Sequence, residues 1–417
     1  MKPAKVLLFI VCVMAVLGTL YELFPDQRSW LTLSTHREVT ELDSTEFTVF
    51  EEDTMVPFTP QPSPVIEIPK VTVDSTTDSR LFLQRFYASL AESDSRVVRV
   101  LHYGDSQIEE DRMTMQLREI FQSEFGGSGV GLMPLVQTIP GLTVKQQLLM
   151  NGRIVNPMQG PQRYFVYGLK KDQRSDDRYG VMGQMAELND SLVRGSEEVT
   201  AVCTPLNGNH YSRWKIFADS SVHYSIAGDT VRLSGKGNVY GLSQESSSGV
   251  IVDNIAMRGC LGLVFTKMDS EQLTSFYREQ NVRLIILQFG GNAIPFNEKP
   301  GTIQGIVKGL REQVQFLRTC APEADILFIG PSDMIRMTDG RWETYPMVSY
   351  MDRLLRKMAL EENIAYFSLF RWMGGSGSML RWQDIGWAGA DGIHFYRSGA
   401  KKAGDAIGNW LLEGMVL

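Results

Sequence analysis

The sequence has few of the residues that build disulfide frameworks or metal centres. Four cysteines in 417 residues are too few for a disulfide scaffold. Cys12 lies in an apolar N-terminal run, and the other three are scattered, so they cannot all pair with one another. The five histidines show no metal-ligand spacing, which argues against a zinc site.

Positive charge and several enzyme motifs are also scarce. The net charge of −7 leaves no basic surface, so we expect no nucleic-acid partner. The chain has no G-x-S-x-G turn, no P-loop and no G-x-G-x-x-G, which disfavours an α/β-hydrolase and the common nucleotide-binding folds. The apolar content of 43% and charged content of 21% are those of a globular protein. The length suggests two or three domains.

The N-terminus carries an apolar run. Lys2 and Lys5 precede sixteen uncharged residues, 6–21, and acidic residues follow, an order that directs the rest of the chain out of the cytoplasm. Sixteen residues fall just short of a membrane span, so a cleaved signal peptide and an uncleaved anchor both stay open. The lack of an A-x-A site favours the anchor. We expect residues 1–24 to be this segment and the protein to be extracytoplasmic, in the periplasm, either anchored to the inner membrane or secreted.

Residues 25–79 have the composition of a linker. They are rich in Ser, Thr and Glu, and prolines cluster in them at positions 57, 60, 62, 64 and 69. Proline at this density favours extended backbone. The segment would carry the folded part away from a membrane surface.

Residues 80–132 and 249–417 show the pattern of an α/β domain. Apolar runs alternate with segments of helical periodicity, such as the face formed by Met113, Leu117 and Phe121. This alternation indicates a parallel sheet with right-handed crossovers, whose chemistry lies at the carboxyl ends of the strands. We predict strands at 96–103, 249–256, 282–291, 324–333 and 364–370.

Residues 133–248 show a different sequence pattern. Apolar and polar residues alternate between closely spaced turn signals, which predicts an inserted all-β domain. Four aromatic residues there are candidates for sugar contact, although aromatics at strand spacing are more often core: Tyr211, Trp214, Tyr224 and Tyr240.

Two short motifs could carry nucleophilic chemistry. Ser106 follows a predicted strand and opens a predicted helix, where it could attack a carbonyl while its own N–H holds the oxyanion. Alternatively, it simply caps the helix. Asp391 and His394 are three residues apart, so in a tight turn the carboxylate would fix the imidazole tautomer and leave Nε2 as a base. Taken alone, this motif also fits a turn with a structural histidine.

Two further residues could complete an oxyanion hole. Asn292 follows a strand after two glycines, and its amide could donate to a developing oxyanion, or support a turn. Gly259 also follows a strand and offers a backbone N–H, or is a turn glycine. His102 lies within a predicted strand, where a packed or hydrogen-bonded role is favoured over that of a second base.

In this order, the four blocks resemble the SGNH, or GDSL-type, hydrolase family. They are "GDSQ" at 104–107, Gly259, "GGN" at 290–292 and "DGIH" at 391–394. The resemblance implies a flavodoxin-like three-layer α/β sandwich with Ser106 as nucleophile, His394 as base and Asp391 as its orienting group. It implies an oxyanion hole of Ser106, Gly259 and Asn292. Gln107 stands where many members have Leu.

The long insertion is similar to that of the peptidoglycan O-acetylesterase branch, in which a β-sandwich resembling a carbohydrate-binding module interrupts the catalytic domain. The resemblance implies a serine esterase that removes O-acetyl groups from a cell-envelope polysaccharide, peptidoglycan first, without a metal or organic cofactor. An O-acetyltransferase with the same site and a non-catalytic sugar-binding protein are the alternatives. The membrane would be contacted through the N-terminal segment only. The sequence leaves open the sugar that carries the ester, the oligomeric state and a Cys260–Cys320 disulfide.

Overall fold

The computed structural model describes residues 78–416 except 136, 138, 151–152, 156–185, 189–197 and 236. The expected N-terminal segment 1–24 and nearly all of the linker 25–79 lie outside these residues. Within the described ranges, no helix combines the length and the apolar character that a membrane crossing requires.

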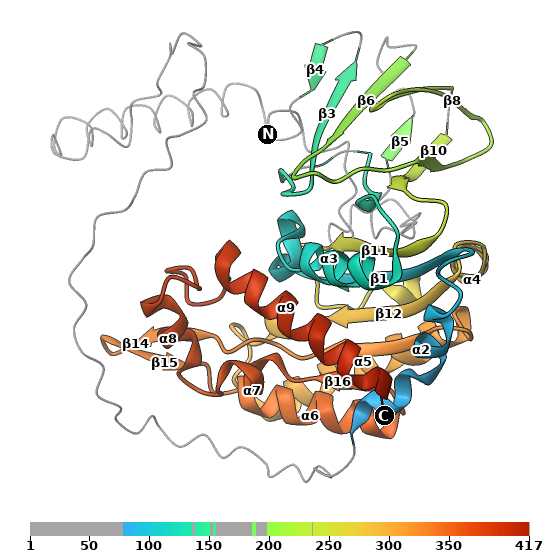
Figure 1. The fold of residues 1–417 in the computed structure, drawn as a ribbon. Coiled ribbons are helices and arrows are strands. Elements are labelled where there is room, and N and C mark those ends of the chain that lie inside the picture. Colours follow the sequence, from blue (N-terminus) through green and yellow to red (C-terminus); the bar gives the residue numbers. More distant parts are fainter. Residues whose placement is uncertain are drawn as a thin grey trace, which may run out of the picture. The chain divides into compact units, whose positions relative to one another are not determined.

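A parallel sheet of five strands forms the centre of the α/β part (Figure 1). Its order is β11 (Gly249–Ala256), β1 (Val97–Gly104), β12 (Val282–Gln288), β13 (Asp325–Ile329) and β16 (Ala365–Phe367). The predicted α/β fold class with a parallel sheet is confirmed. Three predicted strands, 282–291, 324–333 and 364–370, are shorter than expected. The last ends early because the Ser368 side chain accepts a hydrogen bond from Arg371 N and thereby starts a helix, α7 (Leu369–Met373).

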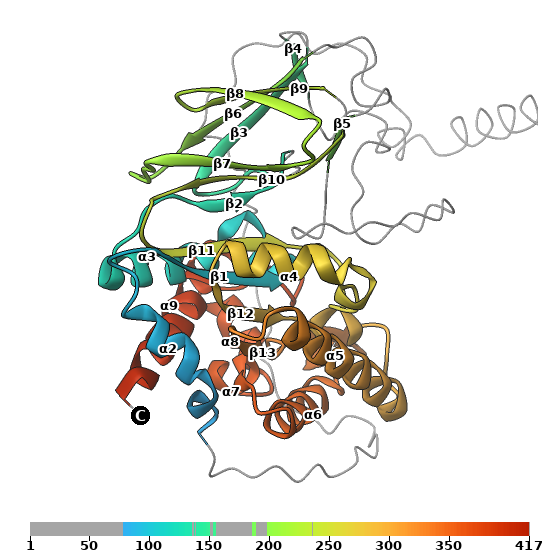
Figure 2. The same cartoon turned by 90° about the vertical axis from the view of Figure 1, so that its right-hand side faces the viewer.

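Both faces of the sheet are covered. Every residue of β1 is buried, and its side chains alternate between two hydrophobic clusters: Leu101 belongs to one and Val100 to the other. This double burial explains why the strands read as continuous apolar runs. The first cluster packs α4 (Ser270–Glu279), α5 (Pro300–Cys320) and α6 (Val348–Glu361) on the sheet. The second packs α2 (Gln84–Leu90), α3 (Thr114–Phe125), α7, α8 (Ser378–Asp384) and α9 (Arg397–Glu413) on the other face (Figure 2).

The remaining short elements connect these layers. A hairpin of β14 (Ile335–Thr338) and β15 (Arg341–Thr344) follows β13 and was not predicted from the sequence. The 3-10 turns are η2 (Ser79–Leu83), η3 (Ser106–Asp111), η5 (Phe265–Lys267), η6 (Gly291–Ala293) and η7 (Gly414–Val416).

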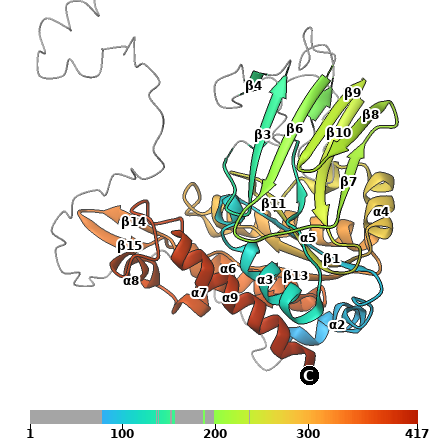
Figure 3. The ribbon, with the colours of Figure 1, turned by 45° about the horizontal axis from the view of Figure 1, so that its top comes forward.

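Between α3 and β11 the chain forms two antiparallel sheets (Figure 3). One contains β2 (Gly131–Met133), β5 (Ala186–Leu188), β7 (Arg213–Ala218) and β10 (Gly237–Glu245). The other contains β3 (Val144–Met150), β4 (Arg153–Val155), β6 (Glu198–Pro205), β8 (Val222–Ala227) and β9 (Thr230–Gly235). Residues of both sheets, such as Leu148 and Leu242, share one hydrophobic cluster. Their antiparallel pairing agrees with an inserted β domain, while the boundaries 133 and 248 stay a prediction.

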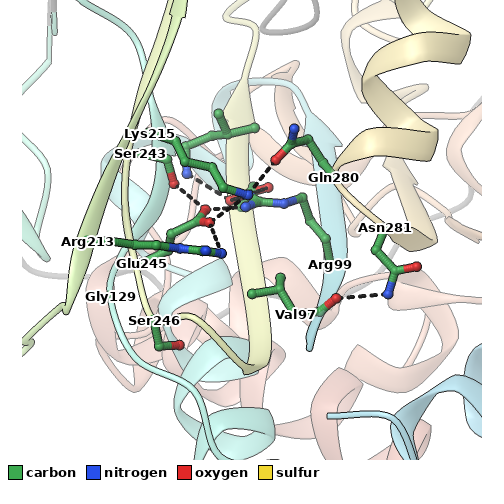
Figure 4. A network of polar contacts seen from close by, with 12 residues as sticks. Val97, Arg99, Gly129, Arg213, Lys215, Ser243, Glu245, Ser246, Gln280 and Asn281 are labelled. Carbon is green, nitrogen blue, oxygen red and sulfur yellow. Dashed lines mark hydrogen bonds and ion pairs between the residues drawn. The ribbon is translucent and has the colours of Figure 1, made fainter. Parts of the chain in front are cut away.

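A buried ionic network connects β10 to the parallel sheet (Figure 4). Arg99 on β1 is fully buried and pairs with Glu245 at the end of β10 and with Asp253 on β11, both also fully buried. The Glu245 carboxylate further pairs with Arg213, at 3.0 Å, and with Lys215, at 2.9 Å. The positive charge of Arg99 is thus compensated by carboxylates more than a hundred positions away in the sequence.

Candidate active site

The strand register brings three of the sequence blocks to one edge of the sheet. Gly104 at the end of β1 lies opposite Ala256 of β11 and Gln288 of β12. The segments that follow these residues therefore begin side by side at the carboxyl edge of the parallel strands. Ser106, Gly259 and Asn292 each lie within four residues of this edge, at the place where α/β sheets bind ligands.

Ser106, His394 and Asp391 form a continuous hydrogen-bonded chain. Ser106 Oγ lies 2.8 Å from His394 Nε2, and His394 Nδ1 lies 2.6 Å from Asp391 Oδ2. The other carboxylate oxygen, Oδ1, accepts from the backbone N–H groups of Ile393 and His394, at 2.9 and 3.0 Å. The short turn from 391 to 394 thus fixes the carboxylate at both oxygens, so that Nδ1 donates to it and Nε2 faces the serine.

The environment of Asp391 favours its ionised form. Partial burial by itself would raise the pKa of this carboxyl. Hydrogen bonds from the His394 side chain and from the backbone N–H groups of His394 and Ile393 outweigh that effect and lower the pKa to about 2. A permanent negative charge beside Nδ1 would stabilise an imidazolium that forms on proton uptake at Nε2.

The backbone after β1 differs from the sequence-based expectation. We expected Ser106 to open a helix, but α3 begins only at Thr114, and Ser106 starts the irregular turn η3. Glu110 and Asp111 have φ angles of 61° and 65°, which interrupt any helix there. A helix dipole at Ser106 is therefore not part of this site. The Asp105 side chain caps the turn instead, with Oδ1 accepting from Gln107 N at 3.0 Å.

Asn292 lies between the serine turn and the Gly259 turn. Its amide nitrogen Nδ2 donates to Asp105 Oδ2 and to Cys260 O, each at 3.1 Å. Both amide protons thus have acceptors, so donation to an oxyanion requires one of these bonds to be shared or released. The two bonds hold the side chain next to the residues that precede Ser106 and follow Gly259.

Gly259 lies in a tight turn directly after β11. Cys260 N donates to Met257 O at 3.0 Å, and Gly259 has a φ of 70°. A positive φ at the third residue alone is the pattern of a type II turn, which favours glycine. The conformation explains why a glycine stands here.

Asp105 is a buried carboxyl at the centre of these contacts. Burial raises its pKa to about 6, and the Gln107 N–H and the His394 charge offset only part of this effect. Above that pH its two oxygens accept from Gln107 and Asn292. Asp105 therefore orients the amide that the sequence suggested for the oxyanion hole.

An open cavity of about 190 Å³ lies beside Ser106, Asn292 and His394. Phe296 stands in its wall with 86% of its surface exposed. The rest of the wall is mostly apolar and includes Phe289, Pro295, Pro331, Met334 and Ile393. A small acyl group and an apolar ring face could both be accommodated next to the serine.

His102 does not share in this cavity. It is fully buried, with Nε2 at 3.0 Å from Gln288 Oε1 and Nδ1 at 2.9 Å from Thr114 Oγ1. Burial lowers its pKa to about 4, against the weaker opposing effect of the Gln288 bond. The interpretation of His102 as a packed, hydrogen-bonded residue agrees with these contacts.

The aromatic residues and cysteines named from the sequence lie away from this cavity or have other contacts. Tyr211 and Trp214 pack edge to face, with ring centroids 5.5 Å apart, and Tyr240 bonds Asp219. Tyr224 has 55% of its surface exposed, whereas Tyr211, Trp214 and Tyr240 are half-buried, and sugar contact stays a prediction for all four. The Cys260–Cys320 disulfide is absent, because both are free buried thiols. Within the described ranges, no cluster of His, Cys, Asp and Glu could hold a metal ion.

Besides Asp105, two residues at the site were not identified from the sequence as functional. Gln107 bonds both neighbours of His394 in the chain, and Arg112 bonds the carbonyl oxygens of Ser106 and Phe395. The only sequence signal was the departure of Gln107 from the family's Leu.

No family model and no curated protein matches this chain. Among solved structures, a peptidoglycan O-acetylesterase is similar at a TM-score of 0.62 and 20% identity, over 82% of this chain and 97% of its own. The periplasmic domain of a lipopolysaccharide acetyltransferase from Salmonella ser. Paratyphi A gives a TM-score of 0.30 and 13% identity, over 40% of this chain and 74% of its own. A GDSL-like lipase from Parabacteroides merdae gives 0.29 and 16%, over 40% and 73%. The predicted resemblance is confirmed at the level of the fold: the chain has the SGNH hydrolase fold.

Proposed function

We propose that this chain is a serine esterase that removes O-acetyl groups from a cell-envelope polysaccharide, peptidoglycan first. The observation that carries the proposal is the hydrogen-bonded chain Ser106–His394–Asp391 at the carboxyl edge of the sheet. The similar solved structure of a peptidoglycan O-acetylesterase supports the choice of acetyl ester and polymer. The site would work outside the cytoplasm, with residues 1–24 as its membrane anchor or signal peptide.

The geometry suits acyl transfer through the serine. His394 Nε2 takes the proton of Ser106 Oγ as the hydroxyl oxygen attacks the acetyl carbonyl carbon. The tetrahedral oxyanion is held by the N–H groups of Ser106 and Gly259 and by the Asn292 amide. One such donor typically lowers the activation barrier by about 3 kcal/mol. The imidazolium then returns its proton to the sugar oxygen, which leaves as a hydroxyl group.

The second half of the reaction regenerates the enzyme. A water molecule gives a proton to His394 Nε2 and attacks the acetyl-serine carbonyl. The ester bond to Ser106 Oγ then breaks, the serine regains its proton from His394, and acetic acid leaves and gives its proton to the solvent as acetate forms. A sugar hydroxyl in place of water would make the same site an O-acetyltransferase.

The test uses the Ser106→Ala variant and O-acetylated peptidoglycan. We expect the wild-type protein to release acetate and to hydrolyse 4-nitrophenyl acetate, and the variant to lose both activities while its far-UV circular dichroism is unchanged. Ser95→Ala, which alters an exposed serine bonded to Glu92 O, is the matched control. Wild-type turnover in Ser106→Ala would refute the nucleophile. Transfer of acetyl to an added oligosaccharide in preference to water would favour the transferase.

A further inference from the structure

The histidine of the site stands on a loop with little regular structure of its own. His394 lies between α8 and α9, and the local pairing is a single β-bridge from Ala388 to Phe395. The side chains of His394 and Asp391 are 36% and 49% exposed. Within the loop, Gly389 N donates to His394 O at 2.8 Å and Tyr396 N to Trp387 O at 3.0 Å. Contacts from outside the loop would add to these in keeping Nε2 at hydrogen-bond distance from Ser106.

Gln107, the residue after the serine, makes such contacts on both sides of His394. Its Nε2 donates to Ile393 O at 2.6 Å, and its Oε1 accepts from Phe395 N at 3.4 Å. Nε2 also lies 3.3 Å from Ser332 Oγ, after β13. With only 9% of its surface exposed, the amide uses donor and acceptor on the two residues that flank the imidazole.

Arg112 makes a second link between the same two segments. Its Nη2 donates to Ser106 O at 2.9 Å and its Nη1 to Phe395 O at 3.0 Å. Nε donates to Glu109 O at 3.0 Å. One planar guanidinium thus bonds the carbonyl of the serine and a carbonyl next to the histidine, a geometry that the ammonium of a lysine does not reproduce.

The irregular turn explains why these carbonyls need side-chain donors. In an α-helix, Ser106 O would accept from the N–H four residues later. The positive φ angles of Glu110 and Asp111 prevent that pattern. The carbonyls of the turn find separate donors, and the Arg112 side chain supplies those for Ser106 O and, beside its own backbone N–H, for Glu109 O. The backbone that presents Ser106 is thereby stabilised by a residue that also holds the histidine loop.

We propose that Gln107 and Arg112 are positioning residues, which keep the His394 imidazole aligned on Ser106 by clamping the loop 393–395 to the serine turn. The inference rests on the proposed serine-esterase function. It assigns a role to the one position of the first block that departs from the family's residue.

The test replaces Gln107 by Leu, which keeps the size of the side chain and removes its hydrogen bonds. We expect kcat for 4-nitrophenyl acetate to fall on the order of ten- to a hundredfold, because a small displacement of a catalytic group has effects of this size. KM should change by less than about twofold, because leucine keeps the size of the Gln107 side chain, which also lines the cavity beside Ser106. Arg112→Met should act in the same direction, and Arg112→Lys should restore little of the loss.

Gln313→Leu is the matched control. Gln313 is also buried, at 4% exposure, and its amide also makes three hydrogen bonds, to Thr266 and Gly309 in another part of the fold. We expect this variant to lower the unfolding temperature about as much as Gln107→Leu while kcat stays at the wild-type value. Equal kcat values per folded molecule in Gln107→Leu and wild type would overturn the proposal, as would a change confined to KM.

A second measurement separates this inference from the proposed function. In protein labelled with ¹⁵N at histidine, the Nδ1 and Nε2 resonances of His394 report its two hydrogen bonds without turnover. We expect Gln107→Leu, and not Gln313→Leu, to shift and broaden them. If the wild-type protein proved inactive on esters, the proposed function would fail, and these spectra would still decide the clamp: unchanged His394 resonances in Gln107→Leu would refute it.

Discussion

Replacing Arg99 by Met tests the buried network that joins β10 to the parallel sheet. The guanidinium lies between the Asp253 and Glu245 carboxylates, and all three side chains have no exposed surface. Methionine fills much of the same volume without a charge, so the variant removes the cation and keeps most of the packing. The two carboxylates then differ in the hydrogen-bond and ion-pair partners that they keep.

Glu245 keeps Arg213, Lys215 and the Ser243 hydroxyl as partners. Asp253 keeps the Leu132 N–H, at 2.7 Å, and loses the cation that opposes its burial. Burial already raises the Asp253 pKa, and the Arg99 charge lowers it in the intact protein. Removing one partner of a buried pair typically costs about 3–5 kcal/mol, because the other charge stays uncompensated. We expect the free energy of unfolding to fall by that amount.

Urea unfolding followed by circular dichroism measures this loss. Arg99→Met combined with Asp253→Asn should recover part of it, because the neutral amide needs no cation. Arg311→Met is the control, since the Arg311–Glu361 pair is solvent-exposed, with 35% and 42% of the side chains accessible, and such pairs contribute at most about 1 kcal/mol. A loss below about 1 kcal/mol in Arg99→Met would contradict the reasoning.

Two further predictions concern a histidine and an aromatic residue of the α/β part. The pKa of buried His102 is depressed from 6.5 to about 4, so on acidification the unfolded chain binds the proton first. The contribution of neutral His102 to stability is therefore complete above pH 6.5 and is lost as the pH falls to 4. The change in the free energy of unfolding is about 3 kcal/mol. His102→Gln should flatten the stability profile in that window, and parallel profiles of wild type and variant would contradict the assignment. Phe296 is 86% exposed beside the serine and should favour a bulky sugar substrate. In Phe296→Ala we therefore expect kcat/KM for O-acetylated peptidoglycan, divided by kcat/KM for 4-nitrophenyl acetate, to fall about tenfold. This is the effect of losing roughly 1–2 kcal/mol of ring contact. A ratio equal to that of an Ile226→Ala control on β8 would exclude such contact.

Much of the α/β part was readable from the sequence because its signals are local. The strands are buried on both faces, so each reads as a continuous apolar run. The face of α5 formed by Ile303, Val307, Leu310, Val314 and Leu317 is buried as its spacing predicts. Residues at strand ends could be placed at one edge because parallel strands share their direction, and the register confirms that Gly104, Ala256 and Gln288 lie in line.

The hairpin β14–β15 was missed although a signal exists. Asp339 and Gly340 both have positive φ angles, 48° and 75°, and Asp-Gly between alternating residues is typical of a two-residue hairpin turn. The irregular turn after Ser106 gave no such signal, because a residue such as Glu110 seldom adopts a positive φ, and a single Asp at position 111 does not by itself indicate one.

The remaining features depend on contacts between distant positions. Arg99 lies in an apolar run, and its partner Glu245 is 146 residues away in the inserted part, so no local pattern pairs them. Gln107 similarly meets Ile393 only after folding, at a separation of 286 residues. Such side chains could be recognised as unusual for their position, but the atoms that they bond could not be named.

The position of β11 at the end of the parallel sheet has a consequence for truncated forms of the protein. β11 pairs with β1 on one side, and on its other side the strand meets the chain that leads into the inserted domain, where Val250 N bonds Gly126 O at 2.9 Å and Asp253 accepts from Leu132 N. Excising residues 126–248 would remove the acceptor of Val250 N and the donor to the Asp253 side chain, and would open this edge to pairing with a strand of another molecule. The segment 126–132 thus protects the edge strand against strand-on-strand aggregation.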